Sequence, residues 1–148
     1  PSQKVILANG GVLLERFVVG RELALSVLGT GEPWALPVVE AIPRGRDFYD
    51  FEARYTPGLT DLVAPARLDD ALAQETARLA IACYRALGCR GVSRVDMLLD
   101  ADGGLWVLEI NAIPGMTDTS LLPKAAEAAG LGFDEVVERI LADAALGA

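Results

Sequence analysis

Polar and apolar residues alternate at the outer ends of two otherwise apolar segments that flank the dipeptide Asp102-Gly103, with polar residues at positions 94 and 96 and at positions 109 and 111. These segments are Arg94–Leu99 and Leu105–Asn111. A period of two is typical of β-strands, and Asp-Gly tolerates the positive φ angles of a two-residue type I′ turn. The pattern therefore predicts a β-hairpin whose tight turn lies at Asp102-Gly103.

The predicted register of this hairpin brings polar side chains together on one face. Asp96 lies opposite Glu109 and Arg94 lies opposite Asn111, and cross-strand partners project to the same side of a sheet. Two opposed carboxylates repel unless a positive charge lies between them, and an all-oxygen set suits a hard cation such as Mg²⁺. The hairpin alone leaves an alternative equally open, a solvated sheet face on which Arg94 pairs the acids in surface salt bridges. The other face is expected to carry Val95, Met97, Leu99, Trp106, Leu108 and Ile110.

Further strands are predicted upstream of the hairpin, at residues 12–18, 22–28 and 37–42. Glu15 lies in the middle of the first strand. Gly20 is expected to end that strand before the second one starts, so that Phe17–Glu22 forms a tight connection. Residues 43–65 show no regular pattern but contain several aromatic side chains. A loop of this length in a compact domain is typical of a lid or a disordered segment, and the aromatic residues favour a lid that docks.

Helical patterns occupy much of the remaining chain, at residues 71–87, 121–129 and 133–146. Asp69 is the expected N-cap of the first and Gly88 its expected end. Thr119 or Ser120 is a candidate N-cap of the second. We expect an α+β fold in which a largely antiparallel sheet is covered by helices. The buried sides of the first and last helices are expected at Leu72, Leu79, Ala80, Cys83, Tyr84 and Leu87, and at Val136, Val137, Ile140 and Leu141.

Composition narrows the classes of partner. The 148 residues include 13 basic and 21 acidic side chains, giving a net charge of −8, and no basic cluster forms a stripe, which argues against nucleic acid. No apolar run approaches the roughly 20 residues of a membrane span, so no membrane partner is expected. Two cysteines are too few for a disulfide framework and favour a reduced, cytosolic compartment. Because the chain starts at Pro1 and enters strand-like sequence at once, we expect it to be a fragment.

A specific resemblance begins at the end of the hairpin, in the run Glu109-Ile110-Asn111-Ala112-Ile113-Pro114-Gly115-Met116-Thr117-Asp118-Thr119-Ser120-Leu121. Other segments that carry it are Leu14–Phe17, Gly20–Glu22, Phe48–Asp50, Ala53–Tyr55, Pro65-Ala66, Leu87–Gly91 and Ser93–Asp96. In this order they resemble the C-terminal half of the D-alanine–D-alanine ligases, ATP-grasp enzymes of peptidoglycan synthesis. The resemblance covers nearly the whole chain. It implies the C-terminal part of an ATP-grasp domain, and an intact enzyme that is a cytoplasmic homodimer.

The resemblance implies a reaction and roles for the hairpin. In that family ATP phosphorylates the carboxylate of one D-alanine, and the amine of a second D-alanine then displaces phosphate through a tetrahedral intermediate. By this resemblance Asp96, Glu109 and Asn111 hold two Mg²⁺ ions, with Mn²⁺ as an alternative, which bridge the ATP phosphates. Arg94 and the backbone N–H of Gly115 resemble the donors that stabilise the oxyanion of the intermediate.

The resemblance also assigns the second substrate. Ser120 and the backbone of Leu121 resemble the site that takes the carboxylate of the second D-alanine at a helix N-terminus, a role compatible with capping. Tyr55 lies in the loop that closes over the site, and relatives with tyrosine there generally make the dipeptide rather than a depsipeptide. We therefore expect both substrates to be D-alanine.

The nucleotide is expected on the upstream strands. By resemblance Glu15 faces the adenine amino group, the backbone of Arg16, Phe17 and Val18 lines the pocket, and Glu22 faces the ribose hydroxyls. Arg54 approaches the γ-phosphate from the lid, at a position where the family usually has lysine. Arginine keeps the charge but is bulkier and differently hydrated, so efficient catalysis is not assured by it.

The chain also departs from the family in extent. The N-terminal domain that binds the first D-alanine and the central domain with a glycine-rich loop are missing from this sequence, and they are the expected partners of the chain. We expect the isolated chain to bind nucleotide weakly and to turn over nothing. The alternatives are a stand-alone Mg²⁺ or nucleotide-binding module, and another carboxylate–amine or D-alanine–D-lactate ligase, against which Tyr55 and residues 116–120 argue.

Overall fold

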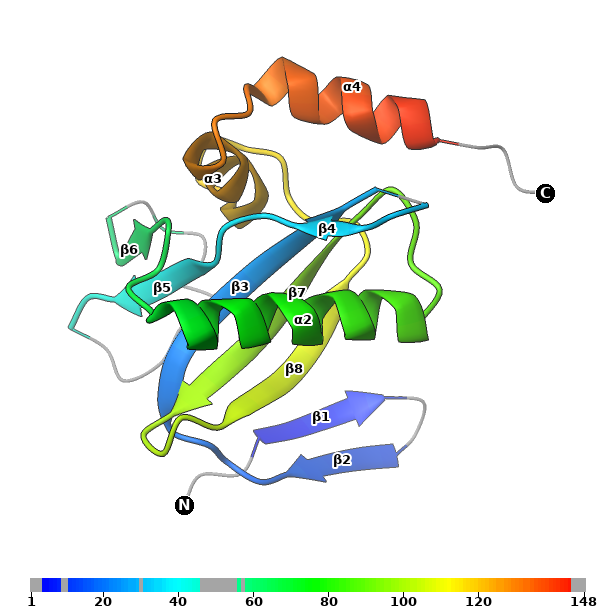
Figure 1. Cartoon of the computed structure of the whole chain (residues 1–148). Coiled ribbons are helices and arrows are strands. Elements are labelled where there is room, and N and C mark those ends of the chain that lie inside the picture. Colours follow the sequence, from blue (N-terminus) through cyan, green and yellow to red (C-terminus); the bar gives the residue numbers. More distant parts are fainter. Residues whose placement is uncertain (1–3, 9–10, 30, 46–55, 57, 145–148) are drawn as a thin grey trace.

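An antiparallel sheet with helices on both faces forms the body of the described structure (Figure 1). The computed structural model describes residues 4–8, 11–29, 31–45, 56 and 58–144. The strand order is β6-β5-β3-β7-β8, with β4 paired to β3, and every described pair is antiparallel. The expected α+β architecture is confirmed. The strands of this sheet are β3 (Gly20–Leu28), β4 (Trp34–Ala35), β5 (Val39–Pro43), β6 (Thr60–Val63), β7 (Val92–Asp100) and β8 (Leu105–Asn111).

The helices divide the core into two layers. Helix α2 (Asp70–Ala86) lies across one face of the sheet, whereas α3 (Leu121–Ala128) and α4 (Phe133–Asp143) lie toward the other (Figure 1). The buried residues under α2 are Leu23, Leu25, Val27, Val38, Ala80, Tyr84, Val95, Met97 and Leu99. Those around α3 and α4 are Ala24, Leu28, Leu36, Val39, Leu121, Leu122, Ala125, Ala126 and Val136. The sheet therefore packs on both sides through alternate residues of β3.

Local signals account for the helix ends. The carboxylate of Asp69 accepts a hydrogen bond of 2.8 Å from the N–H of Leu72, and Gly88 takes a positive φ of 62° after the last turn of α2, as expected from the sequence. The predicted burial of Leu87 and Leu141 is wrong, because these residues lie at or near helix ends and are 69% and 66% exposed. Helix α4 ends at Asp143 rather than at residue 146.

The upstream strands differ from their predicted bounds. A separate two-stranded sheet is formed by β1 (Lys4–Ala8) and β2 (Gly11–Glu15), so the predicted strand at 12–18 is too long and Glu15 ends it. Gly20 does not interrupt the strands as predicted but is the first residue of β3. A Cβ atom at Gly20 would lie 2.5 Å from the backbone oxygen of Leu99, so glycine permits the close approach of β3 and β7 here.

The predicted irregular stretch at 43–65 contains regular structure. Strand β6 pairs with β5 inside it, and Arg44 and Asp61 form an exposed bidentate ion pair of 2.8 and 2.6 Å between the two strands. The prediction missed β6 because it is short and lies at the sheet edge, where only half-buried residues are required. Residues 46–55 and 57 of the predicted lid, including Arg54 and Tyr55, lie outside the described residues.

Candidate functional site

The β7–β8 hairpin has the predicted register only at the end away from its turn. Arg94 pairs with Asn111 and Asp96 with Glu109, as expected. A β-bulge follows, in which Leu108 has no partner and Met97 pairs with Val107. Every pair nearer the turn is therefore shifted by one residue, so the two halves of the hairpin follow different registers.

The turn itself is not the predicted two-residue type I′ turn. Gly103 donates its N–H to the carbonyl oxygen of Asp100 at 3.2 Å, and Asp100 donates to the carbonyl oxygen of Gly104 at 3.0 Å. These hydrogen bonds define a three-residue loop, and Gly103 takes the left-handed conformation in it with a φ of 84°. One extra residue in the loop and one in the bulge compensate, and this is why the predicted pairing survives at the far end.

The shifted register moves Trp106 to the opposite face from the predicted one. Trp106 pairs with Leu98, and so lies on the face of Asp96 rather than with Val95 and Met97. Leu108, expected on the apolar face, is the bulged residue and is 50% exposed. Trp106 changes face because side chains alternate along a strand. One inserted residue therefore moves the side chains on the turn side of the bulge to the opposite face of the sheet.

A buried ion pair occupies the polar end of the hairpin. Arg94 donates from Nε to Asp96 Oδ1 at 2.6 Å and from Nη2 to Oδ2 at 2.7 Å, and the two side chains are only 7% and 8% exposed. On β3 their neighbours are Ser26 and Ala24, both buried. The salt bridge that the sequence offered as an alternative therefore exists, but not as a surface pair. Burial requires that these charges neutralise each other.

The remaining acid and amide of this end are more open. Glu109 is exposed and Asn111 is half-buried, and the Asn111 side-chain oxygen accepts a hydrogen bond of 3.0 Å from the N–H of Ile113. Within the described ranges no group of three His, Cys, Asp or Glu side chains could hold a metal ion. The oxygen donors of Asp96, Glu109 and Asn111 nevertheless fit a hard cation, because they lie on adjacent cross-strand pairs and carboxylate and amide oxygens are the ligands that such a cation takes.

The turn before α3 brings Gly115 against Ser120. A Cβ atom at Gly115 would lie 2.8 Å from Ser120 Oγ, so only glycine allows this approach. Ser120 occupies the N-cap position of α3, but its hydroxyl makes no cap hydrogen bond. It instead accepts from the N–H of Thr117 at 3.0 Å and shares a 2.8 Å hydrogen bond with the Thr117 hydroxyl. The two residues that the sequence assigned to the oxyanion and the second substrate are thus neighbours, and Leu121 directly follows as the first residue of α3.

The nucleotide residues predicted from the sequence are partly connected to the hairpin. The guanidinium of Arg16 lies 5.7 Å from the centre of the Trp106 ring, which ties the segment that holds Phe17 and Val18 to β8. Glu22 is half-buried and lies on the same face of the sheet as Asp96, since Glu22 pairs with Leu98. Glu15 is exposed.

A carboxylate that the sequence analysis did not single out organises the hairpin tip. Asp100 accepts hydrogen bonds from the indole N–H of Trp106 at 2.7 Å and from the N–H groups of Gly104 and Asp102 at 2.7 and 3.0 Å. The bond from Trp106, followed by that from Gly104, holds the pKa of Asp100 below its usual range. An aspartate two residues before Asp-Gly was the available signal.

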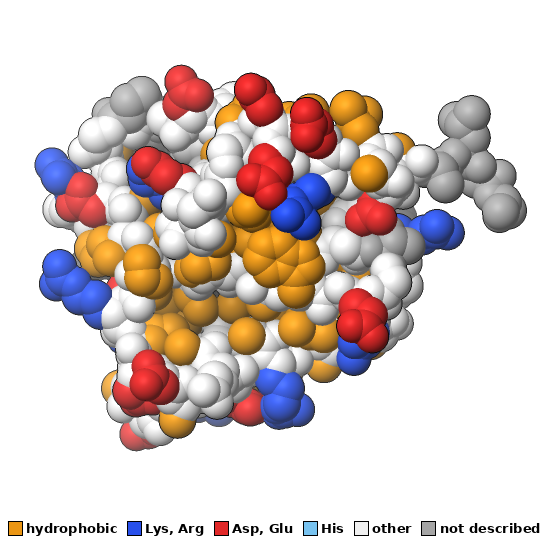
Figure 2. Space-filling model, turned by 45° about the horizontal axis from the view of Figure 1, so that its top comes forward, with side chains coloured by type: hydrophobic (Ala, Val, Ile, Leu, Met, Phe, Trp, Pro, Cys, Tyr) orange, Lys and Arg blue, Asp and Glu red, His pale blue; other side chains and the backbone are white. Residues whose placement is uncertain are grey.

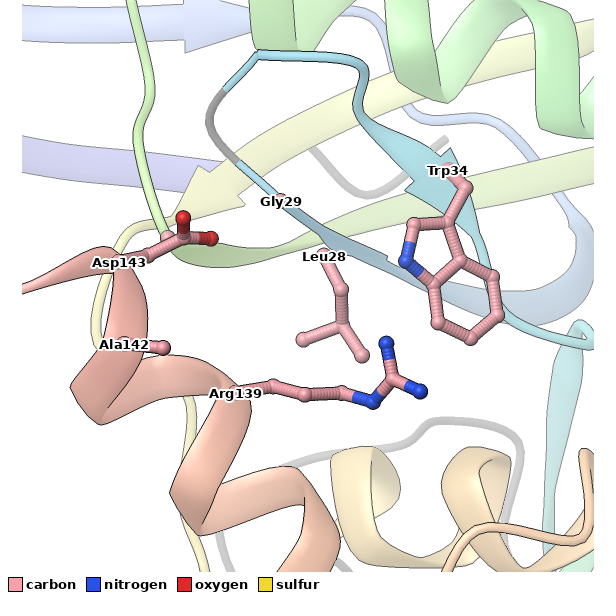
Figure 3. A pocket seen from close by; sticks show the side chains of 7 residues that line it. Leu28, Gly29, Trp34, Arg139, Ala142 and Asp143 are labelled. Carbon is pink, nitrogen blue, oxygen red and sulfur yellow. The ribbon is translucent and has the colours of Figure 1, made fainter.

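A cavity of about 200 Å³ lies elsewhere, between the end of β3 and α4, and contains none of the predicted site residues. The Arg139 side chain reaches toward Trp34, with its guanidinium 5.8 Å from the ring centre, while Asp143 lies on the other side of the cavity, next to Gly91 (Figure 3). Figure 2 shows that apolar side chains gather in the middle of the face viewed from the α4 side, below a group of acidic side chains. None of the helices in the described part of the chain has the length and apolar character of a membrane span.

Comparison with known proteins identifies relatives of nearly the whole chain. Residues 3–142 match the family described as "D-ala D-ala ligase C-terminus". A D-alanine–D-alanine ligase of Carboxydothermus hydrogenoformans is 46% identical over 140 residues, which is 94% of this chain and 45% of that protein. The chain thus spans about half the length of the curated relatives that it matches.

Solved structures have the same fold. The D-alanine–D-alanine ligase of Bacillus anthracis complexed with ATP aligns with a TM-score of 0.72 and 32% identity, over 89% of this chain and 42% of that one. The VanG D-Ala:D-Ser ligase of Enterococcus faecalis aligns with a TM-score of 0.73 and 32% identity, over 88% of this chain and 38% of that one.

Proposed function

The chain belongs to the D-Ala-D-Ala ligase C-terminus family, and from this premise we propose that it is the C-terminal part of an ATP-dependent D-alanine–D-alanine ligase. The observation that carries the proposal is the pairing of Asp96 with Glu109 and of Arg94 with Asn111 on one face of the hairpin. Anionic phosphates and carboxylates are the reacting groups of such a ligase. They require cations and hydrogen-bond donors at one place, and this end of the hairpin supplies both.

Asp96, Glu109 and Asn111 are the residues that would hold Mg²⁺. Bound there, the ions would neutralise the charge of the ATP phosphates during phosphoryl transfer. The chain's own contribution is to fix oxygen donors on adjacent strand pairs, with β3 and β8 on either side of β7. Asn111 is held by its bond to Ile113, which orients the amide oxygen.

Arg94 and the N–H of Gly115 are the proposed donors to the oxyanion of the tetrahedral intermediate. Gly115 can approach a reacting carbon because no side chain blocks it, and its contact with Ser120 supports a shared site for the intermediate and the second amino acid. Ser120 and the backbone of Leu121 would take the carboxylate of the second D-alanine at the start of α3.

Glu15 and Glu22 are the proposed partners of the adenine amino group and the ribose hydroxyls, with the backbone of Arg16, Phe17 and Val18 between them. The contact of Arg16 with Trp106 supports this placement, because it holds the segment at the hairpin. Arg54 and Tyr55 are proposed to act from the lid. The intact enzyme is proposed to be a cytoplasmic homodimer, with its first D-alanine bound by the upstream domains.

The second substrate has a specific competitor. A D-Ala:D-Ser ligase aligns as well as a D-alanine–D-alanine ligase does, so the fold of this chain does not choose between D-alanine and D-serine. Tyr55 and residues 116–120 favour the D-alanine dipeptide over a D-lactate product. Substrate competition between D-alanine, D-serine and D-lactate, with products identified by mass spectrometry, decides among them.

The proposal is tested by ADP release from ATP and Mg²⁺ in the intact protein. We expect release to depend on D-alanine and to yield the D-alanyl-D-alanine dipeptide, with L-alanine as an inactive control. ADP release that does not respond to D-alanine would overturn the substrate assignment. ATP binding without turnover in the intact protein would instead favour a nucleotide-binding module.

A further inference from the structure

We propose that Arg94 is an internal counter-ion that occupies Asp96 until a divalent cation replaces it. Metal loading would then release the Arg94 guanidinium for its role at the oxyanion. The inference rests on the proposed function, since it concerns the same end of the hairpin. It couples metal binding by Asp96 to oxyanion binding by Arg94. Without a bound cation, the two side chains stay paired with each other.

The geometry of the pair leaves neither group ready for its role. Arg94 uses Nε and Nη2 on the two carboxylate oxygens at 2.6 and 2.7 Å, a bidentate arrangement that engages both oxygens of Asp96. Both side chains are almost fully buried, at 7% and 8% exposure. A buried charge without a partner is costly, so each residue keeps the other in place in the absence of another ion.

The surroundings of Asp96 favour its exchange of one cation for another. On the β3 side its neighbour is Ala24, which offers no charge, and on the β8 side its neighbour is the carboxylate of Glu109. A divalent cation between Asp96 and Glu109 would neutralise both acids, which one guanidinium cannot do. Because that cation and the guanidinium repel each other at such short range, binding of the first weakens the hold on the second.

The protein offers a matched ion pair on the opposite face of the sheet. Arg21 donates from Nε and Nη2 to the two oxygens of Glu40, both at 2.7 Å, with side chains 40% and 10% exposed. Its geometry is nearly that of the Arg94–Asp96 pair, but it lies on the face covered by α2 rather than on that of Glu109. Arg21→Gln therefore removes a similar ion pair without touching the proposed cation site.

The test measures binding of Mn²⁺ alone, without nucleotide, to the intact protein by the electron paramagnetic resonance of free Mn²⁺. We expect Arg94→Gln to bind Mn²⁺ about tenfold more tightly than the wild type, because a competing charge is gone. Arg21→Gln should bind as the wild type does. We also expect Arg94→Gln to melt at a lower temperature without metal and to gain more from added Mn²⁺ than the wild type gains.

A purely structural role of Arg94 predicts a different result, namely a lower melting temperature with unchanged or weaker Mn²⁺ affinity, and that result would overturn the inference. If Arg94→Gln does not fold, Arg94→Lys replaces it, because lysine keeps the charge but cannot engage both oxygens in a fork. This variant should bind Mn²⁺ a few-fold more tightly, and equal affinity would count against the counter-ion role. D-alanine-dependent ADP release by the wild type tests the proposed function separately.

Discussion

The two ends of the β7–β8 hairpin each hold an aspartate, and they differ in what satisfies it. At the tip, Asp100 accepts hydrogen bonds from Asp102, Gly104 and Trp106, all fixed by the turn and the strand that follows. This carboxylate is fully used by the local chain. The tip is therefore a structural device that stabilises an exposed turn.

At the far end, the described side chains include one guanidinium and two carboxylates. Arg94 neutralises Asp96, while Glu109 lies opposite Asp96 and is exposed. Among the described side chains this end therefore has an excess of negative charge, and β8 continues from Asn111 into the segment that contains Gly115. The contrast shows that an aspartate by itself does not identify a binding site. The far end is the candidate for binding a cation because its described carboxylates outnumber its described guanidinium.

Deleting Ile110 should give the largest effect on this comparison. The deletion moves Asn111 opposite Val95, which turns its side chain toward α2, and it removes a side chain packed against the core. We expect no cooperative unfolding transition in calorimetry. Deleting Leu108 removes only the unpaired residue of the bulge and keeps Asp96 opposite Glu109, so its free energy of unfolding should change by about 1 kcal/mol or less. Equal damage from both deletions would show that the bulge itself is required.

Asp96→Asn should give the next largest effect. The substitution removes the buried carboxylate charge that Arg94 Nε and Nη2 bind, which lowers the free energy of unfolding by about 3 kcal/mol in urea titrations. Glu109→Gln is the matched change on the facing strand, and because Glu109 is exposed we expect less than about 0.5 kcal/mol. Marked destabilisation by Glu109→Gln would indicate a structural salt bridge at this end instead.

Asp100→Ala should have a moderate effect confined to the tip. It removes the acceptor of three hydrogen bonds and frees the indole of Trp106, so the melting temperature should fall by a few degrees. We expect ligase activity to persist, since the register at Asp96 is set by the strands. Loss of activity at an unchanged melting temperature would show that the hairpin tip contributes to the reaction, which would contradict a purely structural role of Asp100.

The smallest predicted effect is a pH dependence from the tip. The hydrogen bonds from Trp106 and Gly104 hold the pKa of Asp100 below its usual range. The unfolded chain therefore takes up the proton first, and the stabilisation present above the ordinary pKa of about 3.9 is lost as pH falls through the folded-state value. Between about pH 6 and pH 2.5, the melting temperature should fall less steeply in Asp100→Asn than in the wild type. Parallel curves would contradict this assignment.

Local chemistry made part of the fold predictable. Asp69 and Gly88 marked the ends of α2 because capping depends on the residues at the helix end itself. The strand β6 was missed because its pairing with β5 depends on a distant segment rather than on its own pattern. The burial of Leu87 was overestimated for a related reason, since a helical pattern cannot show where the sheet beneath it ends.

The candidate site was predictable in its pairing and not in its details. Asp96 and Glu109 were placed opposite each other from a predicted two-residue turn that the structure does not have. Their pairing is nevertheless correct, because the bulge at Leu108 offsets the extra loop residue. The pattern of apolar and polar residues does not predict such a bulge. The burial of the Arg94–Asp96 pair also depends on β3, whose buried residues Ser26 and Ala24 are its neighbours although they are far away along the chain. The roles of Gly115, Ser120 and the nucleotide residues remain predictions.

The most direct test compares the two ends of the hairpin in one assay. D-alanine-dependent ADP release is measured for Glu109→Gln and Asp100→Asn in the intact protein, each alongside its melting temperature. We predict that Glu109→Gln loses ADP release by at least about a thousandfold while keeping its fold, and that Asp100→Asn retains it. Full activity of Glu109→Gln, or loss of activity in Asp100→Asn alone, would contradict the claim that the charge imbalance at Asp96 and Glu109 serves the reaction.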